Sequence, residues 1–119
     1  MSVDGIVVSV IAGGRENGVS VLKVSGYLDT TTASELETAL LGLLKKNEHK
    51  IVIDLSGVNY ISSAGWGIFI GEIKDIRRKG GDLKLAGMTG DVYEVYQLLE
   101  FSSILEAYDT AEEAAETFK

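Results

Sequence analysis

Two runs rich in β-branched residues stand near the start of the chain, with a polar stretch between them. They cover residues 3–11 (VDGIVVSVI) and 19–24 (VSVLKV), and the intervening segment, AGGRENG, contains three glycines. Because valine and isoleucine favour extended backbone and glycine favours turns, the pattern predicts two antiparallel strands joined by a hairpin loop.

Apolar residues at helical spacing follow a turn that we expect at 26–29. Thr32 and Glu35 have the spacing of a capping box, in which a hydroxyl and a carboxylate satisfy free N–H groups at the start of a helix. The pattern predicts an amphipathic helix that ends near Lys46. Its expected buried face consists of Ala33, Leu36, Leu40, Leu43 and Leu44.

The middle of the chain combines a short apolar run with a second helical pattern. Residues 51–55 (IVIDL) are apolar except for Asp54, which is typical of a strand covered on both faces and predicts a place at the centre of the sheet. A turn is expected at 56–63, followed by a helix over 64–79. Basic residues in the last turn of this helix suit the negative end of its dipole, and the glycine pair directly after it predicts its end.

The last third of the chain repeats the alternation of strands and helices. Strands are predicted at 83–86 (LKLA) and 104–108, and a helix at 91–99. A terminal helix is predicted to start at a second capping box, Thr110 with Glu113. The residues expected to face inward from the helix at 91–99 are Val92, Val95, Tyr96 and Leu99.

The predicted order of elements, ββαβαβαβα, defines the fold class. Strands that alternate with helices are joined by right-handed crossovers. We therefore expect a mixed, mostly parallel sheet of four or five strands, with one antiparallel edge and flanking helices, in an α/β (α+β) sandwich. The length of 119 residues, of which 45% are hydrophobic, predicts a single domain over 1–119.

The amino-acid composition excludes several kinds of site and several classes of partner. With no cysteine and one histidine, disulfides, thiolate sites and histidine metal pairs are excluded, and no cofactor is expected. A formal charge of −7 opposes binding to nucleic acid or anionic lipid, because each phosphate contact normally takes a lysine or arginine. No apolar run reaches the length of a membrane span, and the start lacks the pattern of a secretory signal. We expect a cytoplasmic protein whose partner is another protein.

Three other patterns are better explained by local structure than by catalysis or ligand binding. His49 stands alone, so Ser63 lacks a partner base for a hydrolase triad and we expect no enzyme activity. The glycines at 13–14 and 80–81 match no phosphate-binding loop and predict turns. Three aspartates are spaced too widely for a metal site, which favours turn or capping roles. They are Asp29, Asp54 and Asp82.

The segment 54–71 (DLSGVNYISSAGWGIFIG) places two serines where a buried strand leads into a helix. The first N–H groups of a helix lack internal partners and the helix dipole attracts anions, so a phosphate on Ser63 would have a favourable position there. Ser62 or Ser63 could also be the N-cap of the helix, and the two roles are compatible. Gly65 and Gly67 each lower helix propensity by about 1 kcal/mol, so their presence near a helix start needs another reason, and close approach by a second backbone or side chain is one such reason.

Three segments of the chain resemble the STAS-domain family of anti-sigma-factor antagonists. GYLDTTTASELETAL is similar to that family's GxLDxxTAxxL segment, IVIDLSGVNYISSAGWGIFIG to its DLSxVxYxDSxGLGxL signature, and LLEFSSILEAYDTAEEAAE to its closing segment. The resemblance covers nearly the whole chain. It implies a STAS-like mixed sheet of four or five strands flanked by helices.

The resemblance also implies a function and a site. In the family, the serine after the signature's aspartate is phosphorylated by a partner kinase of the histidine-kinase-like ATPase type, which is also the anti-sigma factor. That serine matches Ser63. The unphosphorylated form is expected to bind the anti-sigma factor and release its sigma factor, and phosphorylation is expected to end this binding. The interface candidates are Asp29, Thr30, Asn59, Tyr60, Ser62, Ser63, Ala64, Gly65 and Trp66.

Two positions depart from the family pattern. Ser62 stands where aspartate is usual, which removes a charge beside the acceptor serine, and Trp66 replaces the signature leucine. Tryptophan at a helix start fits a core or an interface position equally well. Two alternative functions stay open: a STAS interaction module that is never phosphorylated, in a signalling or transporter-associated complex, and a domain that binds a small ligand or nucleotide at the same helix start.

Overall fold

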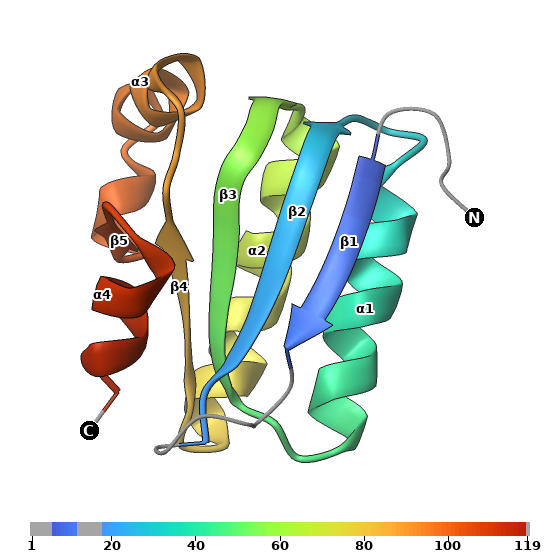
Figure 1. Ribbon diagram of the computed structural model, residues 1–119, viewed down its shortest axis with the longest axis vertical. Helices are drawn as coiled ribbons and strands as arrows, with labels where there is room; N and C mark the ends of the chain where they lie inside the picture. The colour runs from blue at the N-terminus through green and yellow to red at the C-terminus, as the bar shows by residue number, and fades with distance from the viewer. Residues whose placement is uncertain (1–5, 12–17, 119) are drawn as a thin grey trace.

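The computed structural model describes residues 6–11 and 18–118 and contains a five-stranded sheet (Figure 1). The order of the strands in the sheet is their order in the sequence. The first pair is antiparallel and the other three pairs are parallel, which confirms the mixed, mostly parallel sheet. The loop expected between the first two strands lies outside the described residues. The strands are β1 (Ile6–Ile11), β2 (Ser20–Leu28), β3 (Lys50–Ile61), β4 (Asp82–Ala86) and β5 (Ala107–Tyr108).

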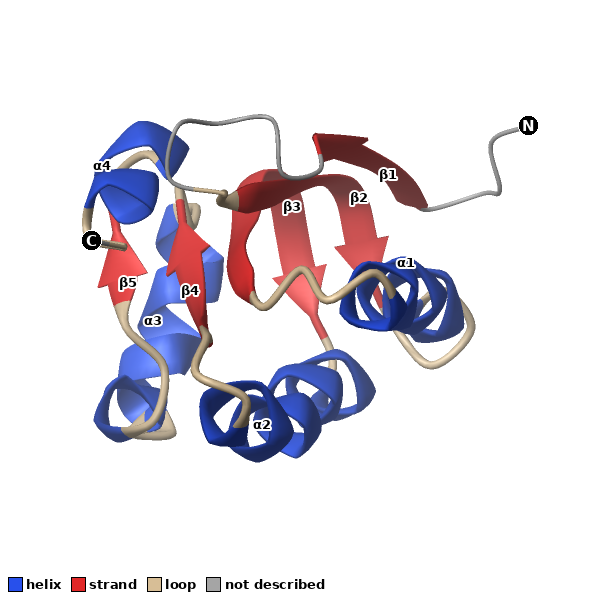
Figure 2. Ribbon diagram, turned by 90° about the horizontal axis from the view of Figure 1, so that it is seen from below, coloured by secondary structure: helices blue, strands red, loops and turns tan. Residues whose placement is uncertain are grey.

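The described residues form four α-helices, which cover the two faces of the sheet unequally. Right-handed crossovers between neighbouring parallel strands bring the first three helices to one face, and the last helix packs on the other face (Figure 2). Within residues 6–11 and 18–118, no helix is long and apolar enough to cross a membrane. The helices are α1 (Ala33–Lys45), α2 (Ser63–Arg78), α3 (Gly90–Leu98) and α4 (Ala111–Glu116).

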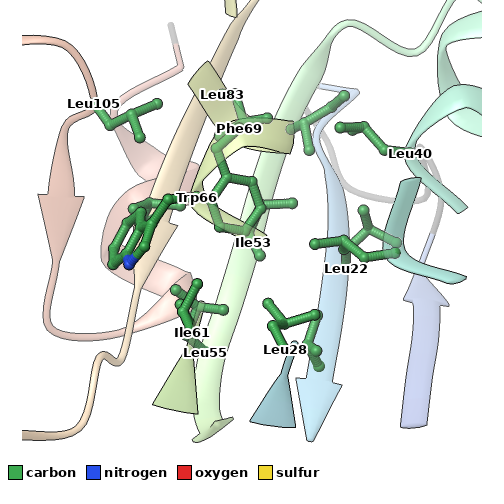
Figure 3. Packing of buried hydrophobic residues seen from close by; sticks show 14 of the residues in the cluster. Leu22, Leu28, Leu40, Ile53, Leu55, Ile61, Trp66, Phe69, Leu83 and Leu105 are labelled. Carbon is green, nitrogen blue, oxygen red and sulfur yellow. The ribbon is translucent and has the colours of Figure 1, made fainter. Parts of the chain in front are cut away.

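The main core lies between the sheet and the helices α1 to α3. Figure 3 shows Leu22 of β2, Ile53 of β3 and Leu83 of β4 packed with Phe69 of α2, and all four are fully buried. On the opposite face of β3, Val52 belongs to a smaller core beneath α4. A strand covered on both faces at the centre of the sheet is therefore confirmed.

Two turns expected from the sequence are in fact strand. β2 continues through Leu28 and β3 through Ile61, because the residues from Ser25 onward pair with those from Gly57 onward. Glycine allows this pairing instead of ending it: a Cβ on Gly57 would lie 2.6 Å from Ser25 Oγ. Two shifts of register between the strands indicate bulges with the extra residue in β3, and Gly26 of β2 has a φ of 104°. The prediction of turns at 26–29 and 56–63 was therefore wrong over most of both segments.

The inward face of α3 is smaller than its pattern predicted. Val92 and Tyr96 are buried, as expected, and the Tyr96 hydroxyl donates a hydrogen bond to the carbonyl of Leu105. Val95 and Leu99 are exposed, so their predicted inward position was wrong. The reason is that α3 packs on β3 and a short 3₁₀ turn at the edge of the molecule, where one stripe of the helix suffices to make contact.

The end of the chain differs from the predicted strand at 104–108. A 3₁₀ helix, Phe101–Ser103, follows α3, and only Ala107–Tyr108 pair with β4. Thr110 caps α4 as predicted, since its hydroxyl accepts a hydrogen bond from the Glu113 N–H at 3.1 Å. Lys84, buried in β4, holds this helix through a 2.6 Å hydrogen bond to Thr117 Oγ.

Candidate docking site at the start of α2

The junction between β3 and α2 is closed by Ser62. Its backbone is extended, with φ −79° and ψ 172°, and its Oγ accepts a hydrogen bond from the Gly65 N–H at 3.3 Å. The carbonyl of Ser62 accepts from the Trp66 N–H at 3.0 Å, which begins the helical ladder. Of the two serines weighed from the sequence, Ser62 is therefore the N-cap.

Ser63 is the first residue of α2, and its side chain is exposed. In the part of the chain that the structure describes, no hydrogen bond uses its hydroxyl. The first turn of α2, all of which is described, contains no acidic residue. The positive end of the helix dipole is thus not neutralised by a side chain, and Ser63 stands where an anion would be stabilised.

A second junction, between β2 and α1, is organised by Asp29. Its Oδ1 accepts hydrogen bonds from the N–H groups of Thr31 and Thr32, both at 2.9 Å, and from Thr31 Oγ at 2.7 Å. The hydrogen bond from the Thr31 hydroxyl is the largest cause that lowers the pKa of Asp29, followed by that from the Thr32 N–H. The carboxylate therefore stays ionised and caps the turn before α1.

The capping box predicted at the start of α1 was wrong. Thr32 takes the N-cap position, yet its side chain makes no capping hydrogen bond to the helix. Its buried Oγ instead lies 2.9 Å from the Tyr27 carbonyl and accepts from the Asp29 N–H at 2.8 Å. The Thr32 hydroxyl is thus engaged within the turn that the Asp29 carboxylate organises, and it is not available to the N–H groups of the helix.

The two junctions are joined by direct contact. The Ser62 N–H donates to the Leu28 carbonyl at 2.7 Å, so the end of β2 holds the start of α2. A Cβ on Gly65 would lie 2.9 Å from Ile61 Cγ2 and 3.1 Å from Leu28 Cβ. Close approach thus explains Gly65, as expected. It does not explain Gly67, around which the structure describes nothing within 4 Å of such an atom, and nothing in the structure accounts for that glycine.

This contrast gives a matched pair of substitutions. Gly67→Ala is expected to raise the free energy of unfolding by up to about 1 kcal/mol, because alanine favours helix and the space is open. Gly65→Ala gains the same propensity but overpacks the junction, so its free energy of unfolding is expected to fall about 1–3 kcal/mol below that of Gly67→Ala. Urea unfolding of both variants measures the difference. Equal stabilities would show that the junction is loosely packed.

Two tyrosines extend the exposed surface beside Ser63. Tyr27 and Tyr60 are register partners on β2 and β3 and are 41% and 54% exposed. Asn59 and Ala64 are exposed as well, and Thr30 is exposed at the neighbouring turn. Tyr27 was missed in the sequence analysis, because only the pairing of β2 with β3 places it next to Tyr60. We refer to the exposed residues of both junctions as the junction surface: Tyr27, Thr30, Thr31, Asn59, Tyr60, Ser63 and Ala64.

Trp66 belongs to the core and not to the junction surface. Its side chain is 3% exposed and packs on Phe101, Tyr96 and Phe69, at ring-centroid distances of 4.9, 6.3 and 6.1 Å. Its indole Nε1 has no hydrogen-bond partner among the described residues. The sequence allowed a core or an interface position for Trp66, and in the structure it is a core residue. Trp66 and Gly65 are both buried, so neither is accessible to a partner at the junction surface.

The remaining candidate residues have structural roles. Asp54 Oδ1 accepts from the Ser56 N–H at 3.0 Å, and Asp82 pairs with Arg77 at 3.0 Å. No group of three metal-ligating residues gathers anywhere in 6–11 or 18–118. His49 precedes the first residue of β3, whereas Ser63 follows the last, so β3 separates the two. Gly80 has a φ of 86° and forms the turn that ends α2, while the glycines at 13–14 lie outside the described residues.

The structure is that of an α/β protein with a mixed β-sheet backed by helices. An exposed serine, Ser63, stands at the start of its second helix, α2. The sequence pattern of the STAS domain matches residues 14–114. The chain belongs to the STAS domain family. A putative anti-sigma factor antagonist of Bordetella bronchiseptica, BtrV, is 32% identical over 103 residues, which cover 87% of this chain and 89% of BtrV.

Solved structures agree with this assignment. An anti-sigma factor antagonist from Mycobacterium paratuberculosis has a TM-score of 0.85 and 26% identity, and the match covers 98% of this chain and 97% of that one. The Bacillus anti-sigma factor antagonist SpoIIAA in its unphosphorylated form has a TM-score of 0.77 at 18% identity, over 93% of this chain and 95% of that one. At that identity the likeness is one of fold.

Proposed function

We propose that the chain is an anti-sigma factor antagonist whose unphosphorylated form binds an anti-sigma factor, and that phosphorylation of Ser63 ends this binding. The names of its relatives support the first part, since BtrV is a putative anti-sigma factor antagonist and the Mycobacterium protein is an anti-sigma factor antagonist. We further propose that residues 1–119 form one domain. Its partner in this proposal is a serine kinase of the histidine-kinase-like ATPase type. The two proteins would meet in the cytoplasm, where transcription occurs.

The single observation that carries the proposal is the position of Ser63. Its exposed hydroxyl is accessible to a kinase, while the neighbouring Ser62 is only partly exposed and already accepts the capping hydrogen bond. A phosphate on Ser63 would lie at the positive end of the α2 dipole. Phosphorylation is therefore compatible with the fold and changes the surface.

The charge of the junction surface explains why a phosphate would prevent docking. The residues of the junction surface are uncharged, and the nearby Asp29 carboxylate is occupied by hydrogen bonds to its own turn. A phosphoserine adds about −1.5 to −2 charges and three acceptor oxygens at neutral pH. A partner fitted to a neutral, tyrosine-bearing surface would have to desolvate that charge without a counter-charge, so the complex would be lost.

Ser62 in place of aspartate is compatible with this proposal. Aspartate and serine are both strong N-cap residues, and either could accept the hydrogen bond from the Gly65 N–H. The replacement therefore keeps the cap and removes one negative charge next to Ser63. We infer that it alters recognition by the kinase and leaves the geometry of the acceptor serine unchanged.

The experiment is phosphorylation of the full chain by the anti-sigma factor kinase of the native host, with ATP and magnesium. Mass spectrometry is expected to place one phosphate on Ser63, and Ser63→Ala is expected to remove it while Ser62→Ala keeps it. A label that remains in Ser63→Ala would contradict the assignment. Tight binding without any label would favour the alternative of an interaction module that is never phosphorylated, an alternative motivated by Ser62.

A further inference from the structure

A cavity of about 580 Å³ lies between α3, the loop after β4 and the strand β5. Its size is within the range of about 300–1,000 Å³ that small-molecule sites occupy. Tyr93, Tyr96 and Tyr108 line it, together with Met88 and Ser56. Neither Ser63 nor any other residue of the junction surface lines it, so this cavity is separate from the proposed docking site.

The aromatic wall of the cavity is already held in place by the protein. Tyr93 and Tyr96 stack with their ring centroids 5.7 Å apart and their planes at 25°. The Tyr96 hydroxyl donates to the Leu105 carbonyl, and Gln97 Nε2 donates to the Tyr93 hydroxyl at 3.2 Å. Because these hydroxyls have protein partners and Tyr96 is buried behind Tyr93, this wall offers a ligand mainly the exposed ring of Tyr93.

The third tyrosine is fixed in a similar way. The Tyr108 hydroxyl donates to Glu106 Oε1 at 2.7 Å, and this hydrogen bond is the largest cause that raises the pKa of Tyr108. Lys84 Nζ lies 5.7 Å from the centroid of the Tyr108 ring, but the lysine forms an ion pair with Glu106 at 3.4 Å. The positive charge nearest to this ring in the described interactions is therefore compensated by a carboxylate.

The charge of the residues that line the cavity favours a positively charged ligand over a negatively charged one. Asp109 lines the cavity and is exposed, and no lysine or arginine of the described chain lines it. An anion would find no counter-charge there, in a chain whose formal charge is −7. A cation would find the Asp109 carboxylate and the negative faces of the tyrosine rings, which attract ammonium groups.

We propose that this cavity binds a small aromatic amine, with its flat ring against Tyr93 and Tyr108 and its ammonium group toward Asp109. Phosphate-bearing compounds such as nucleotides are disfavoured at this position, because their charge has the wrong sign for the lining. The site is independent of phosphorylation at Ser63, and it adds ligand binding to the proposed docking function.

Three compounds of nearly equal shape test the proposal on the ¹⁵N-labelled full chain: 2-phenylethylamine, 2-phenylethanol and 3-phenylpropanoate. Titration followed by amide chemical shifts is expected to show saturable changes at residues around the cavity, such as Gly87, Gln97 and Asp109. The amine is expected to bind about three- to tenfold more tightly than the alcohol, and the propanoate more weakly than either. Ser63→Ala is expected to leave all three affinities unchanged.

Two variants identify the groups responsible. Asp109→Asn is expected to bring the affinity for the amine down to that for the alcohol, and Tyr93→Ala, at an exposed position, is expected to weaken both. The dispersion of the amide spectrum shows whether each variant is folded. Shifts that do not saturate, changes centred away from the cavity, or a propanoate that binds as tightly as the amine would each overturn the proposal.

Discussion

Ser63→Asp is expected to weaken binding to the anti-sigma factor by about 2–4 kcal/mol, which is roughly 30- to 1,000-fold in the dissociation constant. The aspartate places a negative charge at the exposed first position of α2, on a surface whose other exposed residues are neutral. A partner would have to remove water from that charge without pairing it. Titration calorimetry with the purified anti-sigma factor measures the loss.

A charge at the preceding position provides the matched control. Ser62→Asp is expected to bind within about threefold of the unsubstituted chain, because an N-cap carboxylate is occupied by the Gly65 N–H and compensated by the helix dipole. Ser63→Ala is expected to bind normally as well. If Ser63→Asp bound as tightly as these two variants, a switch based on charge at Ser63 would be ruled out.

Trp66→Ala is expected to lower the free energy of unfolding by about 3–5 kcal/mol, the range found when large aromatic residues are removed from cores. The indole fills the space between α2, α3 and the 3₁₀ turn, where it contacts Phe69, Tyr96 and Phe101. Urea unfolding monitored by circular dichroism measures the effect.

The family's own residue at this position gives a graded comparison. Trp66→Leu keeps part of the apolar volume, and it removes an indole N–H that has no hydrogen-bond partner in the described structure. It is therefore expected to cost at most about half as much as Trp66→Ala. A loss below about 1 kcal/mol for Trp66→Ala would mean that the tryptophan is not a core residue in solution.

Much of the fold could be predicted because its elements have strong local patterns. The apolar run at 51–55 indicated a central strand, and the helical spacing before the glycine pair at 80–81 indicated α2. The extensions of β2 and β3 could not be predicted in this way, because they depend on pairing between residues about 32 positions apart, such as Ser25 with Gly57. Their glycines resemble turn residues until the partner strand is known.

The candidate site could be predicted only in part for the same reason. Ser63 was identified by its position at a helix start, and its exposure agrees with that prediction. The position of Trp66 could not be decided from local sequence, since its contacts Tyr96 and Phe101 lie 30 and 35 residues further along. Thr32 makes no capping hydrogen bond because its hydroxyl is engaged by Tyr27 and Asp29 in the turn before the helix, which spacing alone does not reveal.

The hydrogen bond between the Leu28 carbonyl and the Ser62 N–H also bears on the thermodynamics of association. Loops that are mobile in the free protein lose conformational entropy when a partner orders them, and this loss weakens the complex. Here the residue directly before Ser63 is already tied to the end of β2, and Gly65 packs against Leu28 next to this contact. Association should therefore proceed with little rearrangement of this chain, so that most of its binding free energy is available to discriminate between the phosphorylated and unphosphorylated forms.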